Sequence, residues 1–336
     1  KVILMSMFAA TALKTATKNN NKCLTSNGAK AFLSTLDANL DFFSNSGMIN
    51  YSSLVQDFSA AFNENPDLAL RNLLHTRDVR GGKGIRDNSR TLLTWLVKTH
   101  PSVVLESLLI QRLPEVGRWD DLFSLAMAGN TIITNRVIKY LGQEITKPVP
   151  NQLLAKWLPT KSKNETDKFI SSRLRSYLKL TPKEYRQLIV KNRNVVETPM
   201  CNKEWEGINY SHVPSKAMNI YRKSFERNDQ TRFTSFIEQA VKGEVKINAS
   251  TLWPHEVIGH SSSNISQTQE ALWKALPNFL PDDVTILPVV DVSGSMTCKS
   301  YNNYSCMDLS VALGIYLASK TKSSFKDLFV TFHSSP

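Results

Sequence analysis

The stretch Thr76-Arg77-Asp78-Val79-Arg80-Gly81-Gly82-Lys83-Gly84-Ile85-Arg86-Asp87 places four cations and three glycines between two apolar helical patterns. Glycine lets the backbone adopt positive φ and come close to a partner. Consecutive N–H groups in such a loop can surround an anion, and the long cationic side chains add to that attraction. The stretch therefore suits a phosphate ligand. The alternative is a tight connection between helices, in which Arg77 and Arg86 pair with neighbouring acids, and the loop alone favours neither.

Short helical patterns flank this loop. Asn65 is placed to cap the helix before it, and Asp87 or Asn88 to cap the helix after it. Apolar residues from Ala29 onward also recur at helical spacing, and Gly142 is placed to close a later helix. A run of short helices with short connections is typical of stacked helical pairs. We therefore predict a mainly α fold, built as a helical-repeat (HEAT-like) solenoid.

The composition favours an anionic partner. The chain has 336 residues, with 41 Lys and Arg against 29 Asp and Glu, a net charge of +12 and a pI near 9.5. Such a charge favours polyanions, nucleic acid first. Four irregularly spaced cysteines indicate reduced thiols and hence a cytoplasmic location. No stretch has the roughly 18 apolar residues of a membrane span, so we expect no membrane partner.

Residues 150–200 hold eleven cations against four acids, with aromatic residues between them. Cations neutralise phosphates and aromatic rings stack on bases, so this mixture suits single-stranded RNA. Trp157, Tyr177 and Tyr185 are the candidate stacking residues. The alternative is an ordinary basic face whose aromatic rings turn inward to the core. Together with the first loop and a second basic patch, the candidate RNA-binding residues are Arg77, Arg80, Lys83, Arg86, Lys156, Trp157, Lys161, Lys163, Arg173, Arg175, Lys216 and Arg222.

The last segment changes from helical to strand periodicity. Val284 to Val292 is an apolar, β-branched run, an amphipathic helix follows it, and Val330 and Phe332 alternate within a second strand. This order predicts one β-α-β unit of a parallel sheet.

Asp291, Ser293 and Ser295 follow the first of these strands. One carboxylate and two hydroxyls, spaced by two, can face one hard cation, and Mg²⁺ prefers oxygen ligands. A metal with so few charged ligands would accept a carboxylate from a protein partner. The alternative is a helix cap, in which Asp291 and Ser293 bond free N–H groups.

Four stretches resemble a known family: 25–43, Arg77–Gly84, Gly117-Arg118-Trp119-Asp120-Asp121-Leu122 and Pro214-Ser215-Lys216-Ala217-Met218. Together they look like the TROVE module of Ro and telomerase-associated ribonucleoproteins. The resemblance implies a ring of helical repeats over 1–280 and the start of a von Willebrand A-like domain over 281–336. It also implies small structured RNAs and loose RNA ends as ligands, and an adhesion-type metal site that this chain carries only in part.

These observations predict an RNA-binding component of a ribonucleoprotein rather than an enzyme, since the sequence shows no recognisable nucleophile–base set. The alternative is a structural or scaffolding protein of a large assembly, viral for instance, that uses its helical surface and adhesion site for protein contacts.

Overall fold

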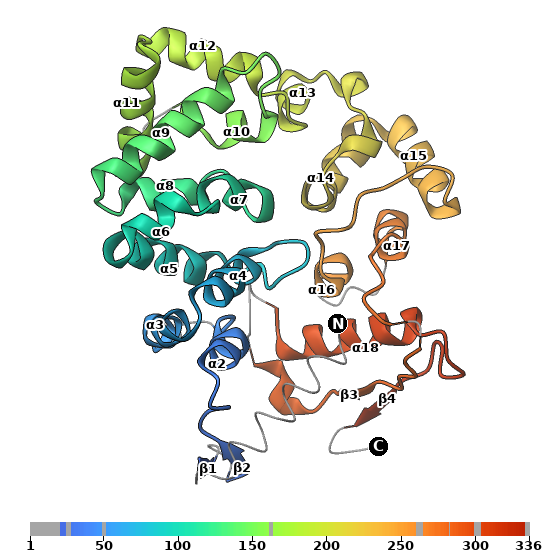
Figure 1. The fold of residues 1–336 in the computed structure, drawn as a ribbon. Helices are drawn as coiled ribbons and strands as arrows, with labels where there is room; N and C mark the ends of the chain where they lie inside the picture. The colour runs from blue at the N-terminus through green and yellow to red at the C-terminus, as the bar shows by residue number, and fades with distance from the viewer. Residues whose placement is uncertain are drawn as a thin grey trace. The chain divides into compact units, whose positions relative to one another are not determined.

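A computed structural model of the protein describes residues 21–24, 28–48, 52–160, 164–259, 265–281, 283–298 and 304–332 (Figure 1). The described residues form 17 α-helices and two small sheets, which confirms the mainly α fold class. The chain divides into two compact units, Lys1–Val195 and Val196–Pro336. Nothing in this division tests a domain boundary at residue 280, which stays a prediction.

The first unit is a succession of short helices in which neighbours along the chain pack on one another. A two-stranded antiparallel sheet, β1 (Lys22–Leu24) and β2 (Lys30–Phe32), precedes them. α2 packs on α3, α3 on α4, α4 on α5, α8 on α9, and α9 on α11 (Figure 1). The helices are α2 (Ala38–Asn45), α3 (Leu54–Glu64), α4 (Pro66–Arg77), α5 (Arg86–Thr99), α6 (Pro101–Glu106), α7 (Leu109–Val116), α8 (Asp121–Met127), α9 (Thr131–Ile145), α10 (Gln152–Trp157), α11 (Glu165–Leu178) and α12 (Pro182–Asn192).

The N-terminal helix expected from Ala29 onward is wrong, because β2 lies there and α2 begins only at Ala38. Asp37 starts that helix by accepting the N–H of Leu40 at 2.8 Å. The predicted cap of α4 is confirmed, since the Asn65 side chain accepts the N–H of Leu68. These short polar residues satisfy N–H groups that have no partner inside the helix.

Two further helix boundaries differ from expectation. α5 begins at Arg86 with the apolar Ile85 at its cap position, and Asn88 inside the helix donates to the Ser46 and Met48 carbonyls. α9 continues through Gly142, since the Tyr177 ring of α11 packs against it. A Cβ at Gly142 would lie 2.5 Å from that ring. This glycine therefore serves close helix packing rather than helix termination.

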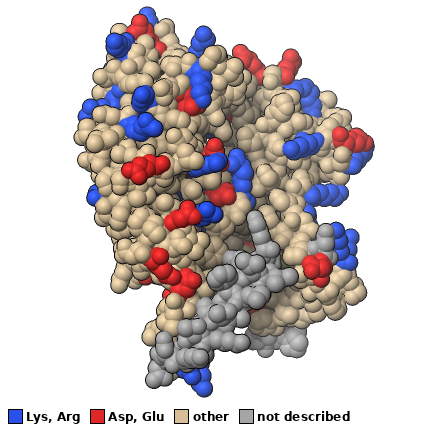
Figure 2. Space-filling model, viewed as in Figure 1, with Lys and Arg blue, Asp and Glu red and all other residues tan. Residues whose placement is uncertain are grey.

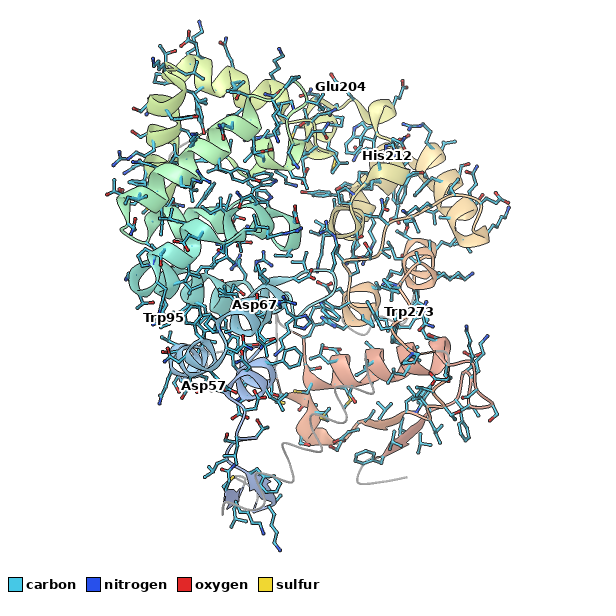
Figure 3. The ribbon with its side chains drawn as sticks, viewed as in Figure 1. Asp57, Asp67, Trp95, Glu204, His212 and Trp273 are labelled. Atoms are coloured by element: carbon cyan, nitrogen blue, oxygen red, sulfur yellow. The ribbon has the colours of Figure 1, made fainter. Side chains whose placement is uncertain are left out.

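Aromatic and aliphatic side chains fill the core of the first unit. Phe42 and Phe58 are fully buried and meet edge to face at 5.1 Å between ring centroids. Trp95 of α5, labelled in Figure 3, contacts Phe58 in the same geometry at 5.5 Å. Such pairs add to the free energy gained from burial alone. The core thus packs α2, α3 and α5 together through their aromatic side chains.

The second unit combines helices with a parallel strand pair. Its elements are α13 (Glu197–Asn202), η1 (Trp205–Gly207), η2 (Tyr210–His212), α14 (Ser215–Asn228), α15 (Gln230–Lys242), α16 (Pro254–Ile258), α17 (Gln267–Lys274), β3 (Val289–Asp291), η3 (Gly294–Thr297), α18 (Cys306–Lys320) and β4 (Val330–Phe332). β3 pairs with β4 in parallel and α18 connects them, so the predicted β-α-β unit is present. Its first strand is shorter than predicted and begins after Pro288, whose carbonyl accepts the Val330 N–H.

α18 is attached to the helices before it through Tyr316, which is buried and donates its hydroxyl to the Pro277 carbonyl at 2.6 Å. The strands are less covered, with Val289 64% and Phe332 51% exposed. Among the described helices, none combines the length and apolarity that a bilayer span needs.

Candidate nucleic-acid interface

The glycine-rich loop between α4 and α5 uses its backbone N–H groups internally. These bonds are Val79 to the Val116 carbonyl, Arg80 to the Asp78 carboxylate, Lys83 to the His75 carbonyl, Gly84 to the Asp78 carbonyl and Ile85 to the Thr76 carbonyl, all at 2.8–2.9 Å. Gly82 is required for this closure, since a Cβ there would collide with the His75 carbonyl. Five backbone N–H groups that could have bound an anion are therefore already hydrogen-bonded within the protein. This agrees with the alternative that the loop is a tight connection between two helices.

Arg77 is buried within the first unit. Its Nε lies 2.8 Å from Asp121 Oδ2, and the two side chains are 3% and 0% exposed. The backbone N–H of Arg118 donates to the same carboxylate, also at 2.8 Å. A Cβ at Gly117 would lie 2.5 Å from Asp121 Oδ2, so glycine leaves room for the pair. Arg77 therefore has almost no exposed surface that RNA could contact.

A second aspartate extends this ion pair into a network. Arg90 lies 2.8 Å from a carboxylate oxygen of Asp120 and 2.8 Å from one of Asp121. Arg118 contacts Asp120 through two nitrogens, at 2.8 and 2.5 Å. Burial by itself raises the pKa of Asp120, but the hydrogen bonds from Arg118 and Arg90 outweigh it, so the pKa lies below its usual value. The network joins the glycine-rich loop to the Gly117–Leu122 motif.

Lys83 of the loop also has an internal role. Its Nζ donates to the Phe43 carbonyl and to Ser46 Oγ, the latter at 3.0 Å, and lies 4.9 Å from the Phe43 ring centroid. These acceptors are at the C-terminal end of α2, where a cation is favoured by the helix dipole and the free carbonyls. Burial lowers the pKa of Lys83. Arg80 donates to the Glu115 carbonyl at 2.7 Å, and Arg86 pairs with Asp87 at 2.8 Å.

We expect Lys83→Met to lower the free energy of unfolding by about 1–2 kcal/mol, because it removes a charged donor from the end of α2. Chemical denaturation measures this change. Lys98→Met is the control, since Lys98 is an exposed cation in the last turn of α5 and its loss should cost under about 0.5 kcal/mol. Unchanged stability together with lost RNA affinity would return Lys83 to the binding site.

A groove of about 910 Å³ opens in the same unit and is lined by both charged and aromatic side chains. Its charged lining residues are Arg90, Asp120, Lys156, Asp167 and Arg193, and its largest aromatic one is Trp157. The Arg118 guanidinium lies over the Trp157 ring, 3.7 Å from the centroid. This cation–π contact holds the indole at the groove. The groove thus brings the ion pairs of Asp120 together with Lys156 and Trp157, which begin the basic stretch 150–200.

Three further cations of the 150–200 stretch either lie outside the described residues or bond carbonyls of the first unit. Lys161 and Lys163 lie outside the described residues, although the flanking Thr160 and Asn164 line the groove. Arg193 donates to the Ala155 and Leu158 carbonyls at 3.0 and 3.3 Å, and so ties the end of α12 to α10.

The aromatic residues of α11 and α12 do not share one role. Tyr185 is only 3% exposed, and its burial raises its pKa, so it cannot stack on a base. Tyr177 is 43% exposed, and its ring packs on Gly142. Arg173 lies 5.3 Å from the Phe169 ring centroid, and Arg175 donates to the Ser171 carbonyl at 3.4 Å. Of the three candidate stacking residues, Trp157 is the one that lines the groove.

The remaining predicted residues belong to the second unit. Lys216 pairs with Glu256, and Arg222 donates to the Asn219 carbonyl at 3.2 Å. They lie on α14, and the groove residues are all in the first unit.

The predicted metal ligands form a compact turn. Asp291 Oδ1 accepts the Ser293 N–H at 2.9 Å, and Ser293 Oγ lies 3.0 Å from Ser295 Oγ. The hydrogen bonds from Ser293 lower the pKa of Asp291. Within the described ranges, no group of three His, Cys, Asp or Glu side chains is arranged to hold a metal. Asp291 bonds a backbone N–H as the cap alternative expected, but the Ser293 side chain does not cap η3, and a bound Mg²⁺ stays a prediction.

Sequence reasoning missed Arg90 and Arg118 as parts of this region. The available signal was the adjacent pair Asp120-Asp121, because two neighbouring acids near a buried helix start require cationic partners. The sequence did not reveal which cations these were.

A family model described as a domain of unknown function, DUF2828, matches residues 25–126 and 138–278. These ranges make up more than half of the chain, so the chain belongs to the DUF2828 family. "Uncharacterized protein L728" of Acanthamoeba polyphaga mimivirus is 29% identical over 366 residues, covering 94% of this chain. The chain spans 62% of that relative's length. No solved structure matches the chain.

The predicted membership in the TROVE family, with a von Willebrand A-like domain after it, is therefore wrong. Two of the motifs that suggested it have a local structural explanation. The motif Arg77–Gly84 forms the closed loop, in which Gly82 leaves room for the His75 carbonyl. The motif Gly117–Leu122 supplies Asp121, the buried partner of Arg77, and Gly117, which leaves room for that pair. Short motifs required by such packing do not identify a family.

Proposed function

We propose that this chain binds single-stranded RNA through the groove of its first unit, and that the helices around the groove form a HEAT-like repeat. The observation that carries the proposal is the groove itself, which combines Trp157 with Lys156, and with Arg193, which also bonds the Ala155 and Leu158 carbonyls. An indole offers a stacking surface to any unpaired base, and nearby cations attract the phosphates beside it. The groove also contains Asp120, whose charge is balanced by Arg90 and Arg118.

The charge around the groove supports the same proposal. The groove opens onto the segment 150–200, which carries eleven cations and four acids. Figure 2 shows Lys and Arg side chains over the part of the surface where α11 and α12 lie in Figure 1, with fewer acids among them. A local surplus of positive charge raises the concentration of a polyanion at that surface and speeds its binding.

The salt dependence of RNA binding tests this proposal. Fluorescence anisotropy would measure the affinity for a labelled single-stranded oligouridine at several KCl concentrations. If three cations contact phosphates, the logarithmic slope should be about −2, so affinity should fall about twentyfold between roughly 50 and 200 mM salt. A duplex RNA of the same length should compete poorly, because its bases are already stacked. No measurable affinity, or an affinity independent of salt, would contradict the proposal.

The scaffolding alternative stays a prediction. One observation favours it, namely the exposed apolar side chains of β3 and β4. Exposed apolar side chains on paired strands are typical of protein contacts where they form one patch.

A further inference from the structure

Two cysteines in the second unit lie within reach of each other. The Sγ atoms of Cys298 and Cys306 are 3.1 Å apart, and the Cys306 N–H donates to the Cys298 carbonyl at 3.0 Å. Cys298 is exposed and Cys306 is half-buried, so small molecules in solution can reach the pair. Neither thiol is used by the groove of the first unit.

Each cysteine is positioned by regular structure. Cys298 directly follows η3, and its N–H bonds the Ser295 carbonyl. Cys306 is the first residue of α18, where the Ser305 N–H donates to the Asp308 carboxylate at 2.8 Å and the Asp308 N–H donates to Ser305 Oγ at 3.1 Å. The short separation of the two sulfurs is therefore set by two anchored chain segments.

We propose that Cys298 and Cys306 are a redox-sensitive pair that forms a reversible disulfide within the chain. A disulfide bond is about 2.05 Å long, so the two sulfurs must approach by about 1 Å. This shift is small because the cysteines are already joined through their backbones. The bond would tie η3, which carries Ser295, to the start of α18.

The oxidant is a small-molecule disulfide such as glutathione disulfide. One cysteine thiolate attacks a sulfur of the oxidant, forms a mixed disulfide and releases one glutathione thiolate. The second cysteine thiolate then attacks the first cysteine's sulfur, closes the internal bond and releases the second glutathione. The two protons lost by the cysteines go to the two released thiolates, so the chain gives up two electrons and the oxidant takes them.

The test equilibrates the folded chain in buffers of increasing glutathione disulfide to glutathione ratio, followed by alkylation and peptide mass mapping. We expect one crosslinked peptide joining Cys298 to Cys306, with Cys23 and Cys201 still open to alkylation. The same titration on the chain unfolded in urea should require an oxidant ratio about tenfold higher, because the fold no longer holds the thiols together.

Two variants separate this pair from chance oxidation. Cys298→Ser should leave Cys306 as a mixed disulfide with glutathione, whereas Cys201→Ser should not change the crosslink. Folded and unfolded chains that oxidise at the same ratio would overturn the proposal, as would a crosslink that joins either cysteine to Cys23 or Cys201.

Discussion

Arg77→Ala is expected to lower the free energy of unfolding of the first unit by about 3–5 kcal/mol, because it removes one of the two guanidinium groups that compensate the buried Asp121 charge. Both side chains of the pair are almost fully inaccessible, so water cannot replace the guanidinium. Arg90 and the Arg118 amide still contact Asp121 in the variant, which favours the lower end of this range. Denaturation in urea, followed by circular dichroism, measures the loss.

The matched control lies on the same helix. Arg71 pairs with Asp67, labelled in Figure 3, but these side chains are 73% and 76% exposed. Exposed ion pairs contribute at most about 1 kcal/mol, so Arg71→Ala should have a small effect. If Arg77→Ala and Arg71→Ala destabilise the protein equally, the buried pair does not hold the two motifs together.

Local signals in the sequence predicted much of the fold. Asn65 caps α4 because capping involves only residues three apart, so the sequence contains the whole interaction. The expected helix after Ala29 failed because apolar residues at helical spacing also occur in loops and hairpins. Leu33 and Leu36 are exposed, and Leu36 adopts a φ of 61°, which a helix does not allow. The pairing of β1 with β2, rather than local periodicity, determines this segment.

The candidate site was less predictable for a physical reason. The sequence shows how many cations a segment has, but not which of them are used inside the fold. Arg77 and Asp121 are separated by 44 residues, and their pairing depends on how α4 meets the start of α8. Lys83 likewise reaches back to the Phe43 carbonyl in α2, which lies 40 residues earlier in the chain. Positive charge near a glycine-rich loop therefore suggested a phosphate site. In the structure, Arg77 and Lys83 instead make ion pairs and hydrogen bonds within the protein.

Trp157→Ala should weaken binding of single-stranded RNA by about 5- to 150-fold, the effect of losing roughly 1–3 kcal/mol of stacking on one base. The ring lines the groove and has Arg118 over it, so it is held in place before RNA arrives. A fixed aromatic side chain loses little entropy on binding, which is why its removal should cost more than that of one flexible cation. Anisotropy at one fixed salt concentration measures the change.

Trp157→Phe separates stacking from stability. A phenyl ring still stacks on a base, so this variant should keep most of the affinity that Trp157→Ala loses. Trp253→Ala is the control for a tryptophan outside the groove, since Trp253 is 47% exposed in the second unit. Trp157 also packs against the core, so the melting temperature of each variant must be compared with that of the parent. A folded Trp157→Ala chain that binds RNA like the parent would exclude the groove as the binding site.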